Sequence, residues 1–207
     1  MADKLELLKD LGEAYRPPAR RPALVEVPEI AFLMLDGSGD PNTSQEYAHA
    51  VEALYTVSYT VKFSVKKGPE GIDFKVMPLE GLWWSDDMAD FLEGRREAWN
   101  WTMMIAQPEV VTPARIQEAI AEAGRKKDVS ALGRLRFDRV REGLCAQIMH
   151  VGPYSAERPT IEALHAFIAE GGYDRRGKHH EIYLGDPRRT ARERLRTIIR
   201  QPLEARG

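Results

Sequence analysis

The feature that most constrains the fold of this chain is an internal repeat. Residues 102–108 (TMMIAQP) align with residues 196–202 (RTIIRQP), 94 positions later, and both read as a strand closed by Gln-Pro. In the same order, residues 33–40 (LMLDGSGD) resemble residues 148–154 (IMHVGPY), and each passage precedes a helical pattern. Self-similarity constrains architecture more strongly than local propensity does. The repeat therefore predicts two halves, each built as strand, helix, strand and strand.

The first half contains the following predicted elements. Apolar residues in 23–35 predict one strand, or two divided at Pro28. The capping box at residues 43–46 begins an amphipathic helix, whereas the alternation of Val61, Phe63 and Val65 predicts a strand. The remaining expectations are a returning hairpin strand at 72–80, an acidic helical stretch to about residue 96 and a strand at 99–106.

The second half follows a connector. Thr112 and Pro113 suit the N-cap and N1 positions of a helix that Gly124 would end. The later pattern predicts two strands at 135–141 and 144–151, a helix at 157–170, a strand at 179–184 and a last strand around 197–199.

These elements define an α+β fold made of duplicated strand-helix-strand-strand halves related by pseudo-twofold symmetry. Residues 1–22 are expected to form an extended lead-in to a single domain at 23–207. Within that domain we place half one at about 23–110, a connector helix at about 112–127 and half two at about 134–207. Two sheets that each have one helix-covered face could line a central ligand groove with their other faces.

Composition limits the classes of function. The 207 residues are 43% hydrophobic and 30% charged, and the net charge of -2 calls for neither nucleic acid nor a membrane surface. Cys145 is the single cysteine, which excludes an intramolecular disulfide. There is no signal-peptide pattern, and no apolar run approaches the roughly 18 residues of a membrane span. We therefore expect a cytoplasmic protein.

Glu181 is the first candidate for chemistry. It lies in the predicted strand 179–184, where Glu181 and Tyr183 share one face and the apolar Ile182 shares the other with Leu184. The apolar face is expected to pack on helices, which leaves Glu181 either solvated or facing the groove. In a groove, burial would raise its pKa unless a cation or a hydrogen-bond donor compensates. Glu80 is the analogous acid in the first half, with a solvated turn carboxylate as the alternative.

Aromatic residues supply candidate walls for a ligand site. All four tryptophans, Trp83, Trp84, Trp99 and Trp101, fall within one short segment, and Trp101 shares a strand face with Met103. They could serve core packing or form a box that stacks on a flat or cationic ligand. Tyr154 follows Gly-Pro and could point into the same groove or close a turn.

No metal or cofactor is predicted. His179 and His180 are adjacent, so on a strand they face opposite ways and cannot chelate one ion together. The Gly37-Ser38-Gly39 turn lacks the third glycine of a dinucleotide motif. The arginines between 188 and 196 have no interleaved aromatics and are interpreted as a solvated face.

The chain resembles the GyrI-like small-molecule-binding domain family in its stand-alone form. The resemblance spans nearly everything after residue 22. It is carried by residues 24–28 (LVEVP), 32–41, 78–84 (PLEGLWW), 99–103 (WNWTM), 150–154 (HVGPY) and 179–187 (HHEIYLGDP).

The resemblance implies a duplicated fold with a pseudo-twofold groove, used by regulators of multidrug efflux as a sensor module. A glutamate in the family's groove, matching Glu181, holds lipophilic and often cationic compounds between aromatic walls. Some stand-alone members are reported as hydrolases that open the strained cyclopropane of DNA-alkylating compounds, a detoxifying reaction. We expect no DNA-binding domain in this chain.

Three hypotheses follow. The first, ranked ahead, is a protein that binds flat hydrophobic or cationic small molecules through Glu181, Tyr183, Glu80, Trp83, Trp84, Trp101, Met103 and Tyr154. The second is a hydrolase in which Glu181 or Glu80 acts as general acid or base. The third is a module that binds a protein partner, which rests on family analogy alone. Ligand identity and the formation of a homodimer stay open.

Overall fold

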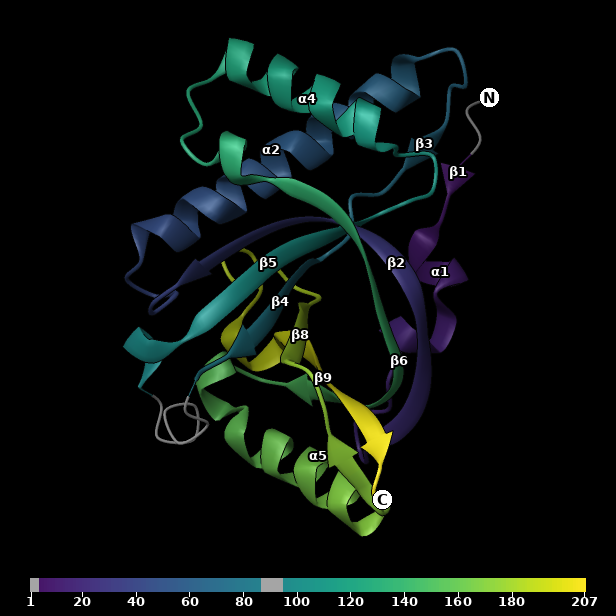
Figure 1. Cartoon of the computed structure of the whole chain (residues 1–207), viewed down its shortest axis with the longest axis vertical. Helices are drawn as coiled ribbons and strands as arrows, with labels where there is room; N and C mark the ends of the chain where they lie inside the picture. The colour runs from purple at the N-terminus through teal and green to yellow at the C-terminus, as the bar shows by residue number, and fades with distance from the viewer. Residues whose placement is uncertain (1–3, 87–94) are drawn as a thin grey trace. The chain divides into compact units, whose positions relative to one another are not determined.

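A computed structural model describes residues 4–86 and 95–207 (Figure 1). The chain divides into two compact units. The first unit comprises Met1–Asp10, Ile30–Leu79 and Trp84–Val140, and the second comprises Leu11–Glu29, Glu80–Trp83 and Arg141–Gly207. Both units combine helices and strands, which confirms the predicted α+β class.

The first unit is built on an antiparallel pair of long strands. Strand β2 (Ala23–Ser38) pairs with β5 (Asn100–Gln107) from Ala31 opposite Gln107 to Ser38 opposite Asn100. Helix α2 (Gln45–Lys67) contacts β5 and also packs on α4 (Pro113–Lys126), and the two helices lie side by side in Figure 1. The smaller elements are the parallel pair β1 (Lys4–Leu5) and β3 (Asp73–Phe74), with 3-10 turns η2 (Arg96–Ala98) and η3 (Leu132–Arg134).

Helix α2 begins as predicted and continues further than predicted. The Ser44 hydroxyl accepts a hydrogen bond from the Tyr47 amide at 3.2 Å, which caps the first turn. The expected strand around Phe63 is wrong, because the helix runs on to Lys67. The buried residues Ala50, Ala53, Leu54, Val57, Val61 and Val65 recur at helical spacing. Burial of this stripe outweighs the strand preference of the valines.

Other helices and strands of the first unit depart from their predicted bounds by a few residues. Residues expected as one returning strand form β3 and then β4 (Leu79–Trp84), separated by four residues. Helix α4 is capped by Thr112 as predicted but passes through Gly124 to end at Lys126. The acidic helical stretch predicted after the tryptophans falls largely on residues 87–94, outside the described residues.

The second unit is centred on strand β9 (Arg196–Ala205). It pairs antiparallel with β6 (Arg136–Val151), β8 (His179–Tyr183) and β7 (Tyr173–Arg175). The two strands expected around Gly143 are therefore one strand, in which Gly143 takes a left-handed φ of +67°. The unit also holds α5 (Arg158–Glu170) and 3-10 turns η4 (Tyr154–Ala156) and η5 (Arg192–Arg194).

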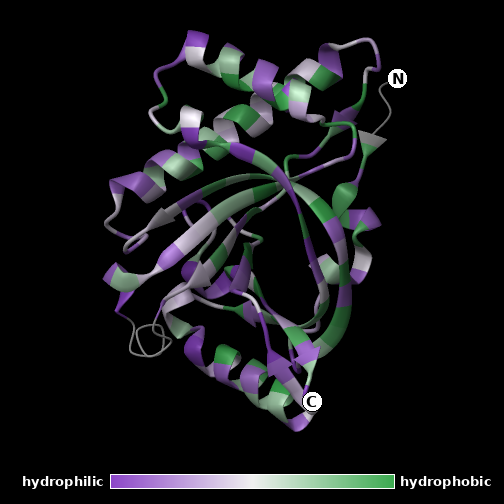
Figure 2. Ribbon diagram, viewed as in Figure 1, coloured by the Kyte–Doolittle hydropathy of each residue, from purple (hydrophilic) through white to green (hydrophobic). Residues whose placement is uncertain are grey.

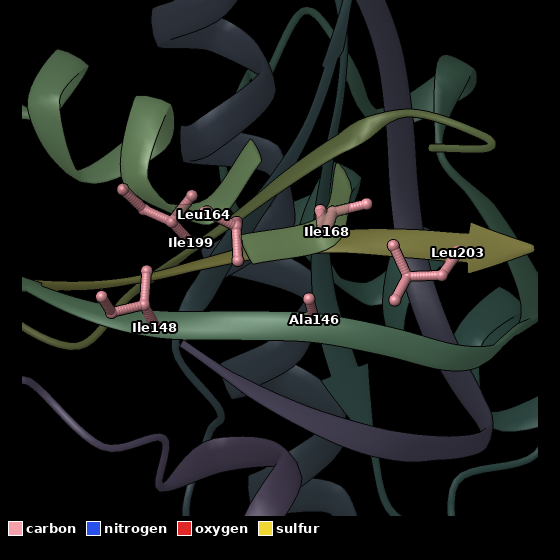
Figure 3. Packing of buried hydrophobic residues seen from close by; sticks show 6 residues of the cluster. All are labelled: Ala146, Ile148, Leu164, Ile168, Ile199 and Leu203. Atoms are coloured by element: carbon pink, nitrogen blue, oxygen red, sulfur yellow. The ribbon is translucent and has the colours of Figure 1, made fainter. Parts of the chain in front are cut away.

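Helix α5 covers one face of these strands. Figure 3 shows Leu164 and Ile168 of the helix over Ile148 and Ala146 of β6 and Ile199 and Leu203 of β9, and these six residues form one buried cluster. Figure 2 shows the matching alternation of hydrophobic and hydrophilic residues along the helix. The sequence predicted this helix because its apolar residues recur at helical spacing.

The repeated passages pair in the same register in the two units. In the first unit Thr102 lies opposite Asp36, and in the second Arg196 lies opposite Val151. Both pairs join residues that the sequence repeat aligns with each other, 102 with 196 and 36 with 151.

The first residues of the chain are not extended as predicted. They include α1 (Leu7–Asp10) and the 3-10 turn η1 (Gly12–Tyr15). The turn buries Ala14 and Tyr15, each less than 5% exposed, in the second unit. This burial explains the departure, because the turn brings the Tyr15 hydroxyl to a buried hydrogen-bond partner.

Candidate functional site

Strand β8 presents a glutamate that two neighbours on the same strand hold in place. Side chains alternate along a strand, so His179, Glu181 and Tyr183 share one face. One Glu181 oxygen, Oε1, lies 3.1 Å from Nε2 of His179, and Oε2 accepts a hydrogen bond from the Tyr183 hydroxyl at 2.7 Å. The Glu181 side chain is 13% exposed. Its carboxylate is thus oriented by two partners on a side chain that is largely buried.

Two further aromatic residues adjoin this face. The Trp83 indole on β4 donates from Nε1 to the Tyr183 hydroxyl at 3.0 Å, which makes Tyr183 both an acceptor and a donor. The ring of Tyr154 meets that of Tyr183 edge to face, with centroids 5.5 Å apart. Tyr154 is 37% exposed, whereas Trp83 is buried. Tyr154 therefore gives the site a surface that a flat ligand could contact.

Helix α5 covers the face of β8 that carries Glu181, whereas the sequence predicted a helix on the opposite face. Glu181 lies opposite Ile199 on β9, and directly opposed residues point to the same side. Because Ile199 packs with α5, Glu181 also points toward the helix-covered side. The helix was predicted on the Ile182 face because that face of the strand is apolar. This prediction is wrong, because β8 is buried on both faces and Ile182 is fully enclosed.

A second acid, Glu157, lies at the start of that helix. It is 5% exposed and follows directly on η4, and Thr197 of β9 lies beside its carboxyl group. The nearby Thr197 hydroxyl acts to lower the Glu157 pKa, but Oε1 of Glu157 has no hydrogen-bond partner within the described part of the chain. A buried carboxyl oxygen without a donor favours the protonated acid.

The two acids have opposite pKa shifts. Burial, and then the negative charge of Glu181, raise the pKa of Glu157 to about 9. Burial also acts to raise the pKa of Glu181, but the hydrogen bond and charge of His179 and the hydrogen bond from Tyr183 outweigh it and lower that pKa. At neutral pH the site therefore holds one protonated acid beside one carboxylate.

The opposite face of β8 carries a buried salt-bridge network. The His180 ring lies between two acids, with Nε2 3.0 Å from Oε2 of Glu80 and Nδ1 3.0 Å from Oε1 of Glu142. The other Glu80 oxygen accepts from the Tyr15 hydroxyl at 2.6 Å. Burial opposes charge on His180, but the two carboxylates outweigh it and raise the pKa of the imidazole to about 9. His180 is therefore an imidazolium at neutral pH.

Arg200 completes this network from β9. Its Nη1 donates to Oε2 of Glu142 at 2.8 Å, its Nε donates to Gln147 at 3.2 Å, and its Nη2 donates to the backbone oxygen of Ala14. Burial opposes ionisation of Glu142, yet His180 and Arg200 together lower its pKa to about 2. Two carboxylates and two cations balance one another, as buried charges require.

The structure thus separates the acids that the sequence placed together. Glu80 is fully buried and bound to Tyr15 and His180, on the face of β8 opposite Glu181. Trp83, Tyr154 and Tyr183 do gather around Glu181.

The other predicted wall residues lie in the first unit. The Trp101 ring meets Tyr47 of α2 edge to face at 5.4 Å and is fully buried, as is Met103 two residues further along β5. Gln107, again on the same face of β5, donates to Ser58 of α2 at 3.1 Å. Trp101 and Met103 therefore belong to the core beneath α2. Trp84 is partly exposed at the end of β4.

Four important residues escaped the sequence analysis: Glu157, Glu142, Arg200 and Tyr15. One signal was available for Arg200, because it stands where the aligned passage has Ala106. An arginine inside an otherwise apolar strand indicates a buried ion pair. Glu142 was interpreted as a turn residue because glycine follows it. Tyr15 and Glu157 carried no local signal.

Two cavities are lined by residues other than Glu181, Glu157 and the aromatic residues of the site. One, of about 460 Å³, lies between α2 and α4 and is lined by Tyr59, Phe63, Lys67 and Lys126 among others. The second, of about 390 Å³, lies beside His150 and Thr160. Among residues 4–86 and 95–207, no cluster of three or more His, Cys, Asp or Glu side chains could hold a metal ion, and no helix there could span a bilayer.

Comparison with known proteins identifies the class. Residues 21–204 match the model of the GyrI-like small molecule binding domain, so the chain belongs to this family. No curated protein matches the chain.

Solved structures extend the comparison. An uncharacterized conserved protein from Listeria innocua is 40% identical, with a TM-score of 0.87 over 97% of this chain and 100% of that one. A hydrolase from Listeria innocua is 39% identical, with a TM-score of 0.84 over 97% of this chain and 100% of that one. The C-terminal domain of EcmrR shares the fold at 14% identity, with a TM-score of 0.57 over 89% of this chain and 98% of that one.

Proposed function

We propose that this chain is a hydrolase for hydrophobic small molecules, with Glu157 as general acid and Glu181 as general base. The observation that carries the proposal is the meeting of two acids on the helix-covered side of β8: Glu181, which His179 and Tyr183 orient, and the buried Glu157. The opposite directions of their pKa shifts support it. Neighbouring titratable groups with pKa values pushed apart are the usual signature of an acid and a base. The similarity to a Listeria innocua hydrolase over the whole length of that chain supports the same class of activity.

The substrate class that we favour is a compound with a strained cyclopropane ring conjugated to an electron-withdrawing group. Glu181 takes a proton from water, and the water oxygen bonds to a ring carbon. A ring carbon–carbon bond breaks, and its electron pair moves to the conjugated group, which takes the proton from Glu157. The net reaction adds one water, and the acids regain their starting states when a proton returns from Glu181 to Glu157 directly or through solvent.

Trp83, Tyr154 and Tyr183 would hold the flat part of such a substrate. Tyr183 of β8 contacts the carboxylate, and Trp83 of β4 and Tyr154 of η4 contact Tyr183. We also propose that the chain is duplicated into two halves, and the equal register of the repeated passages supports this.

The test is mass spectrometry of a cyclopropane-containing alkylating compound incubated with the protein. We expect wild type to form the water adduct, and Glu157→Gln and Glu181→Gln each to slow its formation by roughly 10²-fold or more. Glu162→Gln is the matched control, because Glu162 lies on α5 in an exposed ion pair with Arg158 and should react like wild type. Consumption by wild type no faster than in buffer would reject hydrolysis of this class.

A second candidate is binding without reaction. An ionised Glu181 beside aromatic rings suits an aromatic cation. Titration with ethidium, followed by tryptophan fluorescence, tests it: Glu181→Gln should weaken binding. Unchanged fluorescence over the whole titration would count against this candidate.

A further inference from the structure

His180 occupies the most constrained position in the second unit. Its side chain is fully buried, and both ring nitrogens face carboxylate oxygens at 3.0 Å, one on β4 and one on β6. A neutral imidazole has one N–H donor and could satisfy one carboxylate, whereas an imidazolium satisfies both. Both ring nitrogens therefore lie where the two N–H groups of an imidazolium would each reach a carboxylate oxygen.

Further residues fix the two carboxylates themselves. Tyr15 donates to the free oxygen of Glu80, and Arg200 donates to the free oxygen of Glu142. Arg200 lies directly opposite His180 in the β8–β9 ladder and opposite Gln147 in the β6–β9 ladder. The network thus joins β4, β6, β8, β9 and the η1 turn at one point beneath β8.

We propose that His180 is a positioning residue for Glu181, acting from the opposite face of β8 through the network that holds it. The proposal rests on the proposed function in one respect: both candidate activities use the Glu181 carboxylate. His180 lies on the face of β8 opposite Glu181, so its effect is exerted through the backbone and through its charge.

Two physical effects connect the adjacent residues. First, β8 is short, with five residues, so anchoring His180 between two strands fixes the direction in which the next side chain leaves the backbone. Second, a fixed positive charge at the next residue favours the carboxylate form of Glu181. This charge is among the causes that lower the Glu181 pKa, after the His179 and Tyr183 contacts.

The test compares two variants that differ only at position 180. Glu80→Gln/His180→Gln removes one carboxylate and one imidazolium, so the buried charges of Glu142 and Arg200 still cancel. Glu80→Gln alone keeps His180 beside the Glu142 carboxylate and is the matched control, with the charge of its ring checked by ¹⁵N shifts. The primary readout is the titration of the Glu181 side-chain carboxyl carbon by ¹³C NMR, with unfolding temperatures measured for both proteins.

We expect the Glu181 titration midpoint to lie about 1.5 pH units higher in the double variant than in the control, as for charges roughly 8 Å apart at an effective dielectric constant of about 20. The acid limb of the hydrolysis profile should move by the same amount. Equal midpoints in two folded proteins would overturn the proposal. A purely structural role would change the unfolding temperature and leave the midpoint in place.

A measurement on the wild-type protein keeps the proposal testable if the double variant does not fold. The ¹⁵N shifts of the His180 ring should show both nitrogens protonated at pH 7, and a neutral ring at that pH would overturn the inference. Both NMR readouts are independent of turnover. Failure to hydrolyse any substrate would therefore reject the proposed activity without affecting this result.

Discussion

Replacing the protonated acid Glu157 by its neutral isostere should stabilise the protein and inactivate it. The reason lies in the sign of the pKa shift. The folded state raises the pKa of Glu157 from 4.5 to about 9, so between these values the folded protein holds a proton that the unfolded chain has released. Stability from this group is therefore fully present below about pH 4.5 and is lost as pH rises toward 9. Glu157→Gln removes that loss.

The magnitude follows from the linkage slope. A proton held only by the folded state lowers the free energy of unfolding by about 1.4 kcal/mol for each unit by which the pH rises. From pH 4.5 to pH 7 the cost reaches about 3 kcal/mol, and it does not depend on the upper pKa as long as that pKa exceeds 7. We therefore expect Glu157→Gln to gain about 3 kcal/mol at pH 7, less at pH 6 and nothing near pH 4.5.

The assay is urea unfolding followed by tryptophan fluorescence at pH 5, 6, 7 and 8. The difference between variant and wild type should grow with pH by about 1.4 kcal/mol per unit. Glu162→Gln on the same helix is the control and should change stability by less than about 0.5 kcal/mol at every pH, because its ion pair with Arg158 is exposed. A Glu157→Gln protein less stable than wild type at pH 7, or a difference that does not vary with pH, would refute the reasoning.

Three further predictions concern single contacts. Gly37→Ala should destabilise the first unit by about 1–3 kcal/mol or more, because its Cβ would lie 2.2 Å from the buried Trp101 ring, and thermal unfolding will measure this. Tyr183→Phe should slow hydrolysis roughly 10- to 100-fold at pH 7, because the carboxylate of the site loses a charged hydrogen bond; an unchanged rate would exclude that role. Tyr15→Phe should cost about 1–3 kcal/mol of unfolding free energy, since it leaves an oxygen of buried Glu80 without its donor, and a stability equal to wild type would argue against the network.

The sequence predicted most of the second unit because its patterns are local and regular. Helix α5 and strand β8 appear within a residue or two of their predicted bounds. The repeat identified the start of β9 from the resemblance of residues 196–202 to 102–108, but the predicted close at Gln201-Pro202 is wrong, because the strand continues to Ala205 in its pairing with β7. Each of these elements carries its own periodicity or alignment, so no knowledge of distant contacts was needed.

The wrong predictions concern residues whose structure is determined by contacts with residues far away in the sequence. Val61, Phe63 and Val65 alternate like a strand, but the buried stripe that begins at Ala50 keeps them helical. Glu80, which ends a predicted strand, was interpreted as the counterpart of Glu181 in the first half, yet its partners are Tyr15 and His180, 65 and 100 residues away. Such pairings depend on register and on the face of a strand, which one sequence does not reveal.

Strand β8 shows why its adjacent residues His180 and Glu181 have different roles. His180 faces a network in which every carboxylate oxygen has a donor, and a network so satisfied is rigid and costly to disturb. Glu181, one residue on, faces a site where Glu157 keeps an oxygen without a donor. An unsatisfied buried acid costs stability and is retained where it performs chemistry. Alternation along one short strand thus puts a stable anchor directly behind a destabilised acid pair, so substitutions at 157 and 180 should change stability in opposite directions.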